Sequence, residues 1–233
     1  MVSKVPKHIA IILDGNRRFA KKLGLKPWKG HDFGLRKLEE LFSWCIELGI
    51  KELTLYCFST ENFKRAKQEI DYLLKLFWKE FAKMKDGQGM FKNKIKVNVI
   101  GRLNMFSKKM RDAMFEAMER TKNNKALVVN FALAYGGRQE ITDAVNKIVK
   151  QIKQGKIKIN NINEKLITKN LYLKSEPDLM IRPGGEIRTS NFLTWQSIYS
   201  EWIFIDKLWP EFTKEDLIKC IEEFKRRERR YGA

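Results

Sequence analysis

Residues 8–18 read H-I-A-I-I-L-D-G-N-R-R, an apolar run that passes directly into an acidic turn containing glycine. Residues 9–13 include no polar side chain, which predicts a strand covered on both faces, as in parallel sheets. Gly15 favours a tight turn, because glycine adopts backbone conformations that other residues avoid. A helix is predicted at about 16–24, so an anion at this turn would meet the free N–H groups of a helix start.

Strands and helices alternate through the rest of the chain. Further strands are predicted at 52–58, 95–100, 126–134, 178–181 and 202–205, with helices at about 30–48, 66–84, 107–121, from 137, at 163–171 and at 213–230, and a loop at 85–89. This order predicts an α/β fold: a single domain, residues 1–233, whose mostly parallel central sheet carries helices on both faces. The carboxyl ends of such strands share one edge, where ligands bind.

Four strands run into tips rich in arginine, glycine and small polar residues, which predicts an anion site at that edge. The tips are residues 14–18 (D-G-N-R-R), 59–65 (S-T-E-N-F-K-R), 135–138 (Y-G-G-R) and 182–191 (R-P-G-G-E-I-R-T-S-N). Arginine suits phosphate, whereas the Asp14 carboxylate repels it. Either a divalent metal bridges Asp14 and a diphosphate, or Asp14 only caps a helix. His31 also has two interpretations, as a proton shuttle or as a structural residue.

The charge of the chain points to anionic partners. Its 233 residues include 47 Lys and Arg against 28 Asp and Glu, a formal net charge of +19. Nucleic acid, an anionic membrane surface and phosphorylated substrates all fit this excess. Three cysteines without a C-x-x-C pair indicate thiols in a reducing cytoplasm. The sequence has no Walker motif, no dinucleotide fingerprint and no apolar stretch of about 18 residues.

Taken together, the motifs resemble the cis-prenyltransferase family, which includes undecaprenyl and dehydrodolichyl diphosphate synthases. They follow the family's order over nearly the whole chain: H-I-A-I-I-L-D-G-N-R-R-F-A-K-K from residue 8, L-T-L-Y-C-F-S-T-E-N-F-K-R from 53, N-F-A-L-A-Y-G-G-R from 130, D-L-M-I-R-P-G-G-E-I-R-T-S-N-F-L-T-W-Q from 178 and R-R-E-R-R-Y-G from 226. Departures from the bacterial pattern resemble an archaeal or eukaryotic-type member, of which the archaeal type is preferred. Phe19 and Phe63 replace tryptophans, Arg17 replaces glycine, and Pro27 replaces an arginine for which Lys26 or Lys29 could substitute.

The resemblance implies Mg²⁺-dependent cis-prenyl chain elongation. Isopentenyl diphosphate is added repeatedly to an allylic diphosphate primer, farnesyl or geranylgeranyl diphosphate. The product is a long-chain polyprenyl diphosphate, a precursor of a glycosyl carrier lipid. The resemblance also implies a homodimer. We therefore expect a cytoplasmic protein with peripheral attachment to a membrane and no nucleic-acid partner.

Position by position, the resemblance assigns roles to individual residues. Asp14 and Glu201 would bind the metal, and Asp14, Asn62 and His31 would act in catalysis. Arg182, Arg188 and Ser190 match the isopentenyl diphosphate site, and Arg230 and Gly232 match a C-terminal motif that reaches the partner subunit. The full set expected to bind substrates is Gly15, Asn16, Arg17, Arg18, Phe19, His31, Ser59, Thr60, Glu61, Phe63, Arg65, Arg182, Arg188, Thr189, Ser190, Arg230 and Gly232.

A growing apolar product needs an apolar container. We expect a tunnel between the sheet and the helix that carries Ile70, Leu73, Leu74, Phe77 and Phe81, although the same spacing also suits ordinary core.

Two other functions fit parts of the sequence. A non-catalytic accessory subunit would have lost the Asp14 or arginine motifs, which are present, and a nucleic-acid binder would carry a recognisable binding motif, which is not found. The enzyme is therefore the favoured interpretation.

Overall fold

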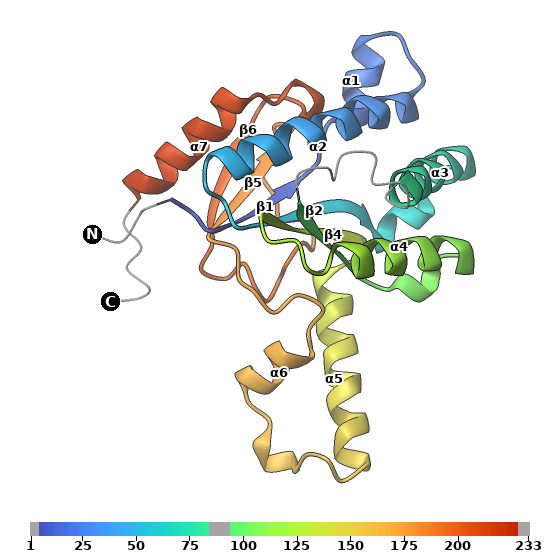
Figure 1. Ribbon diagram of the computed structural model, residues 1–233, viewed down its shortest axis with the longest axis vertical. Coiled ribbons are helices and arrows are strands. Elements are labelled where there is room, and N and C mark those ends of the chain that lie inside the picture. Colours follow the sequence, from blue (N-terminus) through green and yellow to red (C-terminus); the bar gives the residue numbers. More distant parts are fainter. Residues whose placement is uncertain (1–4, 84–93, 228–233) are drawn as a thin grey trace.

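Six parallel strands form the centre of the molecule, in the order β3-β4-β2-β1-β5-β6 (Figure 1). The computed structural model describes residues 5–83 and 94–227. Its strands are β1 (His8–Ile12), β2 (Glu52–Ser59), β3 (Ile95–Ile100), β4 (Leu127–Tyr135), β5 (Leu179–Pro183) and β6 (Glu201–Ile205). All five strand pairings in this described part are parallel. The predicted α/β fold with a parallel sheet is therefore confirmed.

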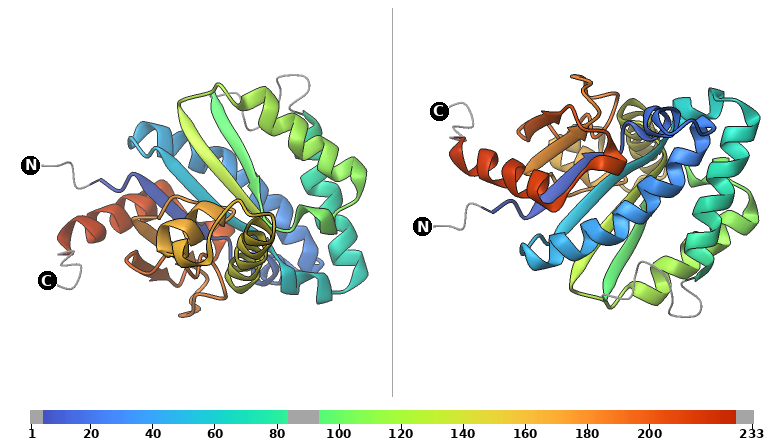
Figure 2. Two further views of the ribbon diagram at one scale, coloured as in Figure 1. Left: turned by 90° about the horizontal axis from the view of Figure 1, so that it is seen from below. Right: turned by 90° about the horizontal axis from the view of Figure 1, so that it is seen from above.

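Seven α-helices accompany the sheet within the described ranges. They are α1 (Asn16–Lys22), α2 (Gly30–Glu47), α3 (Lys67–Lys83), α4 (Lys108–Thr121), α5 (Gly137–Lys153), α6 (Glu164–Asn170) and α7 (Lys214–Arg226). Helices α2, α3, α4 and α7 cover one face, whereas α5 starts at the other face and extends away from it with α6 (Figures 1 and 2). The loop predicted at 85–89 and the predicted helix end at 228–230 lie outside the described residues.

Alternate residues of each strand build two separate cores. Ile9 and Ile11 of β1 face the larger core, where α2 contributes Leu38 and Phe42 at a spacing typical of one helix face. Ala10 and Ile12 of β1 face a smaller core, which is closed mainly by the loop after β5 rather than by helices. Helices are thus present on both faces, as predicted, but unequally.

The strand β5 is longer than the sequence suggested, and the difference involves Arg182. The prediction ended this strand at residue 181 and assigned Arg182 and Pro183 to the loop that follows. In the structure, Arg182 and Pro183 continue β5 and lie opposite Phe204 and Ile205 of β6. Strand pairing therefore overrides local preference, and Arg182 projects from a rigid strand instead of a loop.

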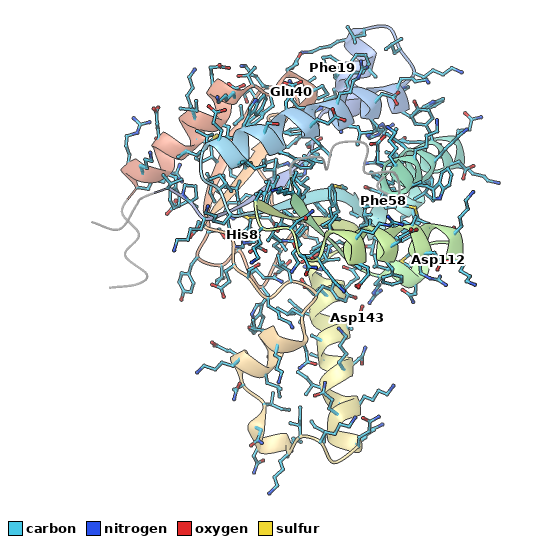
Figure 3. The ribbon with its side chains drawn as sticks, in the orientation of Figure 1. His8, Phe19, Glu40, Phe58, Asp112 and Asp143 are labelled. Atoms are coloured by element: carbon cyan, nitrogen blue, oxygen red, sulfur yellow. The ribbon has the colours of Figure 1, made fainter. Side chains whose placement is uncertain are left out.

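A buried polar cluster lies at the amino end of the sheet, where Figure 3 labels His8. The His8 Nε2 atom lies 2.8 Å from Thr54 Oγ1, and Asn130 Nδ2 donates to Thr54 Oγ1 (2.9 Å) and Glu52 Oε1 (2.7 Å). Burial lowers the pKa of His8 from its ordinary 6.5, despite the nearby Glu52 carboxylate. His8 therefore binds a proton less readily in the folded chain than in the unfolded chain.

The lowered pKa of His8 makes the stability of the fold depend on pH. Since the unfolded state binds more protons below about pH 6.5, we expect the free energy of unfolding to fall as the pH drops through that value. Urea unfolding at pH values from about 7.5 to 5.5 measures the effect. The variant His8→Gln cannot take up this proton, so its stability should vary less over the same range. Identical slopes for both proteins would contradict the role given to His8.

Candidate active site

The turn after β1 fixes Asp14 at the carboxyl edge of the sheet. Gly15 has φ 106°, and a Cβ atom at this position would lie 2.8 Å from Leu208 Cβ, so only glycine fits. The Asp14 carbonyl accepts a hydrogen bond from the backbone N–H of Trp209 at 2.8 Å. The strand order reverses between β1 and β5, and this is the point where open α/β sheets bind ligands.

Two arginines hold the Asp14 carboxylate at that point. The Arg182 side chain is only 4% exposed, and its Nη2 donates to Asp14 Oδ2 at 2.8 Å. Its Nη1 donates to Ser190 Oγ at 2.8 Å and to the carbonyl of Arg188. Arg18 Nη2 lies 3.2 Å from Asp14 Oδ1. Both carboxylate oxygens are therefore engaged, and the side chain has a fixed direction.

The tip of β2 is ordered by a capping interaction. The register of β2 against β4 shifts between Tyr56 and Ser59, and such irregularities commonly redirect side chains next to functional sites. Asn62 Oδ1 accepts the backbone N–H of Ser59 at 3.1 Å. Burial opposes ionisation of Glu61, but hydrogen bonds from its own backbone, Ser59, Thr60 and Asn191 outweigh it and lower its pKa. Glu61 is therefore a carboxylate at neutral pH.

A second group of charges gathers between α1, α2 and α3. Arg65 Nη1 lies 3.0 Å from Glu69 Oε1, and His31 Nε2 lies 3.6 Å from the same oxygen. Arg17 Nε approaches Glu69 Oε2 at 3.7 Å. Three basic side chains from different parts of the chain thus surround one carboxylate.

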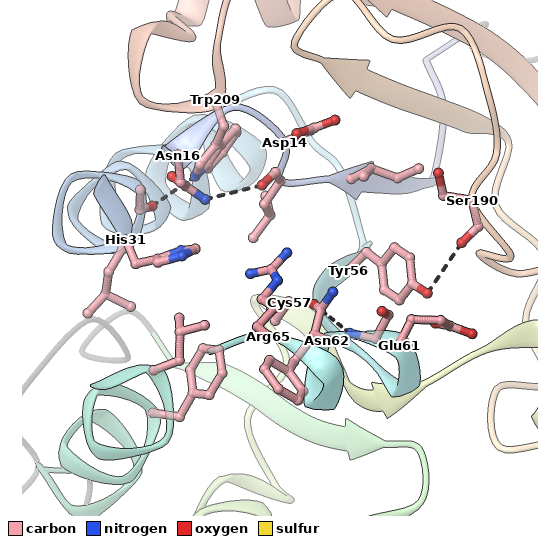
Figure 4. Close-up of a pocket in the computed structure, with 18 of the residues that line it drawn as sticks. Asp14, Asn16, His31, Tyr56, Cys57, Glu61, Asn62, Arg65, Ser190 and Trp209 are labelled. Carbon is pink, nitrogen blue, oxygen red and sulfur yellow. Dashed lines mark hydrogen bonds between the residues drawn. The ribbon is translucent and has the colours of Figure 1, made fainter. Parts of the chain in front are cut away.

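These groups border two connected hollows. The main cavity has a volume of about 620 Å³, and the predicted site residues among its lining are Asp14, Asn16, His31, Ser59, Glu61, Asn62, Arg65, Arg182, Arg188 and Ser190. Figure 4 shows Asp14, His31, Asn62 and Arg65 converging on this space. The basic recess, about 420 Å³, is lined by Leu13, Asp14, Gly15, Asn16, Arg17, Arg18, Lys21, Pro27, His31 and Arg65. Asp14 borders both hollows.

The main cavity becomes apolar between α2 and α3. Leu35, Leu38, Leu73 and Phe77 line that end. A smaller hollow continues beyond Phe77 towards side chains that include Glu80, Phe81, Phe131 and Leu133. Leu73, Phe77 and Phe81 thus lie where a tunnel was expected, whereas Ile70 and Leu74 pack against the core. The structure therefore joins a charged mouth to an apolar interior.

Several predicted site residues do not line either hollow. Phe19 packs edge-on against Phe33, with ring centroids 5.2 Å apart, on the outer helix α1 (Figure 3). Phe63 packs edge-on against Phe58 at 4.9 Å, and Thr189 borders a separate recess of about 380 Å³ beside Arg138. Thr60, between Ser59 and Glu61 at the tip of β2, also lines neither hollow. Arg230 and Gly232 lie outside the described residues.

Glu201 does not meet Asp14 within one chain, contrary to expectation. It begins β6 opposite Leu179, at the amino end of the sheet, and pairs with Arg227 at 2.9 Å. Asp14 follows the carboxyl end of β1. A strand rises about 3.3 Å per residue, so the two carboxylates lie at opposite ends of the sheet. The sequence motif did not reveal this separation, because it does not show at which end of the sheet Glu201 lies.

The two lysines considered as substitutes for the missing arginine lie elsewhere. Lys29 Nζ donates to the Tyr72 hydroxyl at 3.2 Å, and Lys26 Nζ lies 5.6 Å from the centre of the Trp28 ring. Neither side chain lines the basic recess, whereas Lys21 and Pro27 do. Lys21 is therefore the lysine that adds positive charge there.

Sequence reasoning missed Tyr56, Gly34 and Trp209, which line the main cavity. The Tyr56 hydroxyl donates to the carbonyls of Tyr135 (3.3 Å) and Ser190 (3.4 Å), and so joins β2 to the loop after β5. Trp209 Nε1 donates to the Gly34 carbonyl at 2.9 Å. Trp209 follows the carboxyl end of β6, so applying the strand-end rule to this last strand would have found it.

The site suits a magnesium ion that arrives with phosphate ligands. The described residues contain no group of three His, Cys, Asp or Glu side chains able to hold a metal. Mg²⁺ is usually bound through one or two carboxylates together with substrate phosphates. Asp14 supplies one carboxylate, and the surrounding arginines suit the phosphates. The donor set therefore fits a metal shared with a bound diphosphate.

Comparisons with known proteins agree with this arrangement. The family model described as "Putative undecaprenyl diphosphate synthase" matches residues 12–232. A tritrans,polycis-undecaprenyl-diphosphate synthase (geranylgeranyl-diphosphate specific) of Pyrococcus abyssi is 50% identical over 230 residues, covering 98% of this chain and 87% of that protein. This relative agrees with the archaeal type predicted from the sequence.

Two solved structures share the fold. The lavandulyl diphosphate synthase of Lavandula x intermedia, in complex with dimethylallyl diphosphate, superposes with a TM-score of 0.92 at 32% identity and covers 99% of both chains. A probable undecaprenyl diphosphate synthase of Campylobacter jejuni gives a TM-score of 0.80 at 35% identity, covering 98% of this chain and 99% of that one. The chain therefore belongs to the undecaprenyl diphosphate synthase family and is a cis-prenyltransferase, an enzyme that elongates prenyl diphosphate chains.

Proposed function

We propose that the chain uses Mg²⁺ to add isopentenyl diphosphate repeatedly to geranylgeranyl diphosphate, giving a long-chain polyprenyl diphosphate for a glycosyl carrier lipid. The observation that carries this proposal is the position of Asp14, between Arg182 and Arg18, where the basic recess and the main cavity meet. A diphosphate can be neutralised there while its hydrocarbon tail enters an apolar space. The Pyrococcus abyssi relative, named as geranylgeranyl-diphosphate specific, supports this primer over farnesyl diphosphate.

The two substrates would occupy neighbouring positions. The allylic diphosphate suits the basic recess, where Arg17, Arg18 and Lys21 supply positive charge. Isopentenyl diphosphate suits Arg182, Arg188 and Ser190 at the other side of Asp14. Holding both substrates around one carboxylate brings their reacting carbons together and lowers the entropic part of the barrier.

Asp14, His31 and Asn62 would act on the reacting groups. Magnesium, when bound, supplies charge neutralisation for the departing diphosphate. Asp14 would hold the ion, and His31, which borders both hollows, would hydrogen bond to the allylic diphosphate. Asn62 has no basic atom, so it would orient a group involved in proton loss instead of taking the proton itself.

Removal of the Asp14 charge should abolish most of the activity. In Asp14→Asn, we expect incorporation of labelled isopentenyl diphosphate to fall on the order of a thousandfold, because several kcal/mol of charge stabilisation are lost. The amide keeps the shape of the side chain, so the thermal unfolding midpoint checks folding. Glu40→Gln, at an exposed carboxylate paired with Lys37 outside the site, is a control for loss of one negative charge. Near-normal turnover in Asp14→Asn would contradict its assignment.

The apolar end of the cavity should limit product length. Phe77 borders both the main cavity and the smaller hollow, so Phe77→Ala is expected to join them. Thin-layer sizing of products should show chains longer by one or more isoprene units. Trp78→Ala, a large truncation at the neighbouring residue that lines neither hollow, is the control. Unchanged products from Phe77→Ala would place the growing chain elsewhere.

We also propose a homodimer. The arm formed by α5 and α6 extends from the body (Figure 1) and exposes Val145, Val149, Ile159 and Ile162. Strand β6 is at an edge of the sheet, beside the exposed side chains of Ile198 and Tyr199. Exposed apolar side chains at these two places support an interface there.

Sedimentation velocity tests this assembly. We expect a species of twice the 27.6 kDa chain mass, and partial dissociation when Val145 and Val149 are both replaced by glutamate. A monomer in active wild-type enzyme would contradict the dimer. Peripheral membrane attachment stays a prediction, for which co-sedimentation with anionic vesicles at low and high salt is the test. No helix within the described residues has the length and apolarity needed to cross a bilayer.

A further inference from the structure

One buried carboxylate lies behind the basic recess without lining it. The side chain of Glu69, in the first turn of α3, is only 4% exposed. It is absent from the lining of both the main cavity and the basic recess. A charged group is costly to bury unless other groups compensate it. Its neighbours must therefore explain its position.

Those neighbours are three of the basic groups that face the recess. Arg65 Nη1 lies 3.0 Å from Oε1 of Glu69, and His31 Nε2 lies 3.6 Å from the same oxygen. Arg17 Nε lies 3.7 Å from Oε2. Arg17 belongs to α1, His31 to α2, and Arg65 to the segment before α3. One carboxylate thus contacts basic side chains from three separate segments of the chain.

The charge of Glu69 is present at neutral pH. Proximity to His31, against the opposing effect of burial, and then the charges of Arg65 and Arg17 lower the pKa of this carboxyl. Partial burial also lowers the pKa of Arg65, against the opposing effect of the Glu69 charge. Without a counter-charge, two guanidinium groups this close would repel each other and lose their common direction.

We propose that Glu69 is a positioning residue, which holds Arg65, Arg17 and His31 in the geometry that receives the allylic diphosphate. The inference rests on the proposed assignment of that substrate to the basic recess. Glu69 itself does not touch the substrate. Its carboxylate fixes one side of the basic groups, so their remaining N–H donors point into the recess, and less side-chain entropy is lost when the diphosphate binds.

Two effects of removing this charge have opposite signs, and this makes the proposal testable. If Glu69 only added negative charge near the recess, its neutralisation would strengthen binding of an anionic substrate. If it positions the basic groups, neutralisation weakens binding, because the donors lose their alignment. The direction of the change in affinity therefore separates the two accounts.

The test compares Glu69→Gln with Asp71→Asn. Both variants remove one carboxylate charge from the first part of α3, but Asp71 is exposed, whereas the amide introduced by Glu69→Gln keeps the size of the buried side chain. We expect the KM for the allylic diphosphate to rise roughly tenfold in Glu69→Gln, the effect of weakening one charge-assisted hydrogen bond. The KM for isopentenyl diphosphate should stay within about twofold, and Asp71→Asn should leave both KM values near wild type.

A binding measurement complements the kinetics. Inorganic diphosphate should raise the thermal unfolding midpoint of wild type and of Asp71→Asn, but raise that of Glu69→Gln by much less at equal concentration. Glu69→Asp keeps the charge on a shorter side chain and should recover part of the affinity. If Glu69→Gln does not fold, Glu69→Asp takes its place in the test. Its KM for the allylic diphosphate should lie between the wild-type value and the value expected for Glu69→Gln.

An unchanged or lower allylic KM in Glu69→Gln would overturn the proposal. So would equal losses for both substrates, since these indicate a general structural role. A rise confined to the KM for isopentenyl diphosphate would instead mean that the proposed substrate assignment is wrong, because the basic recess would then hold the other diphosphate. The two failures are therefore distinguishable.

Discussion

The contact between Arg182 and Asp14 is the interaction on which the rest of the site depends. It joins the carboxyl ends of β5 and β1, the two strands on either side of the point where the strand order reverses. A guanidinium that is only 4% exposed needs a partner, and removing one member of such a pair leaves an uncompensated buried charge. The same guanidinium holds Ser190 and the Arg188 carbonyl, so the loop after β5 also depends on it.

The pair also divides the site by chemical character. On one side of Asp14 lie the basic recess and the side chains supported by Glu69, and on the other the Arg182 loop. Away from these charged groups, the lining of the main cavity becomes apolar between α2 and α3, because both helices direct leucine and phenylalanine side chains towards the sheet. An amphipathic molecule with a charged head therefore has one favoured orientation in the cavity, with its tail away from the charges.

Much of this arrangement follows from the sequence, because parallel strands place their carboxyl ends at one edge. The residues after β1 and β2 were predicted correctly to border a common space, since each follows an unambiguous apolar strand. Glu201 was predicted to bind the metal with Asp14 but lies at the amino end of the sheet, because a motif does not show where along a strand its residues fall. The role of Glu69 could not be seen either. Its spacing from Arg65 suits an ordinary helix pair, and only tertiary packing adds Arg17 and His31.

The most direct test is a crystal structure of the chain with magnesium and a non-reactive thio-analogue of geranylgeranyl diphosphate. The account predicts that the diphosphate lies in the basic recess within hydrogen-bond distance of Arg17 or Arg18, with a metal ion at Asp14. The hydrocarbon tail should run past Leu73 towards Phe77. A diphosphate bound away from Asp14, or a tail lying on the outer surface of the molecule, would contradict it.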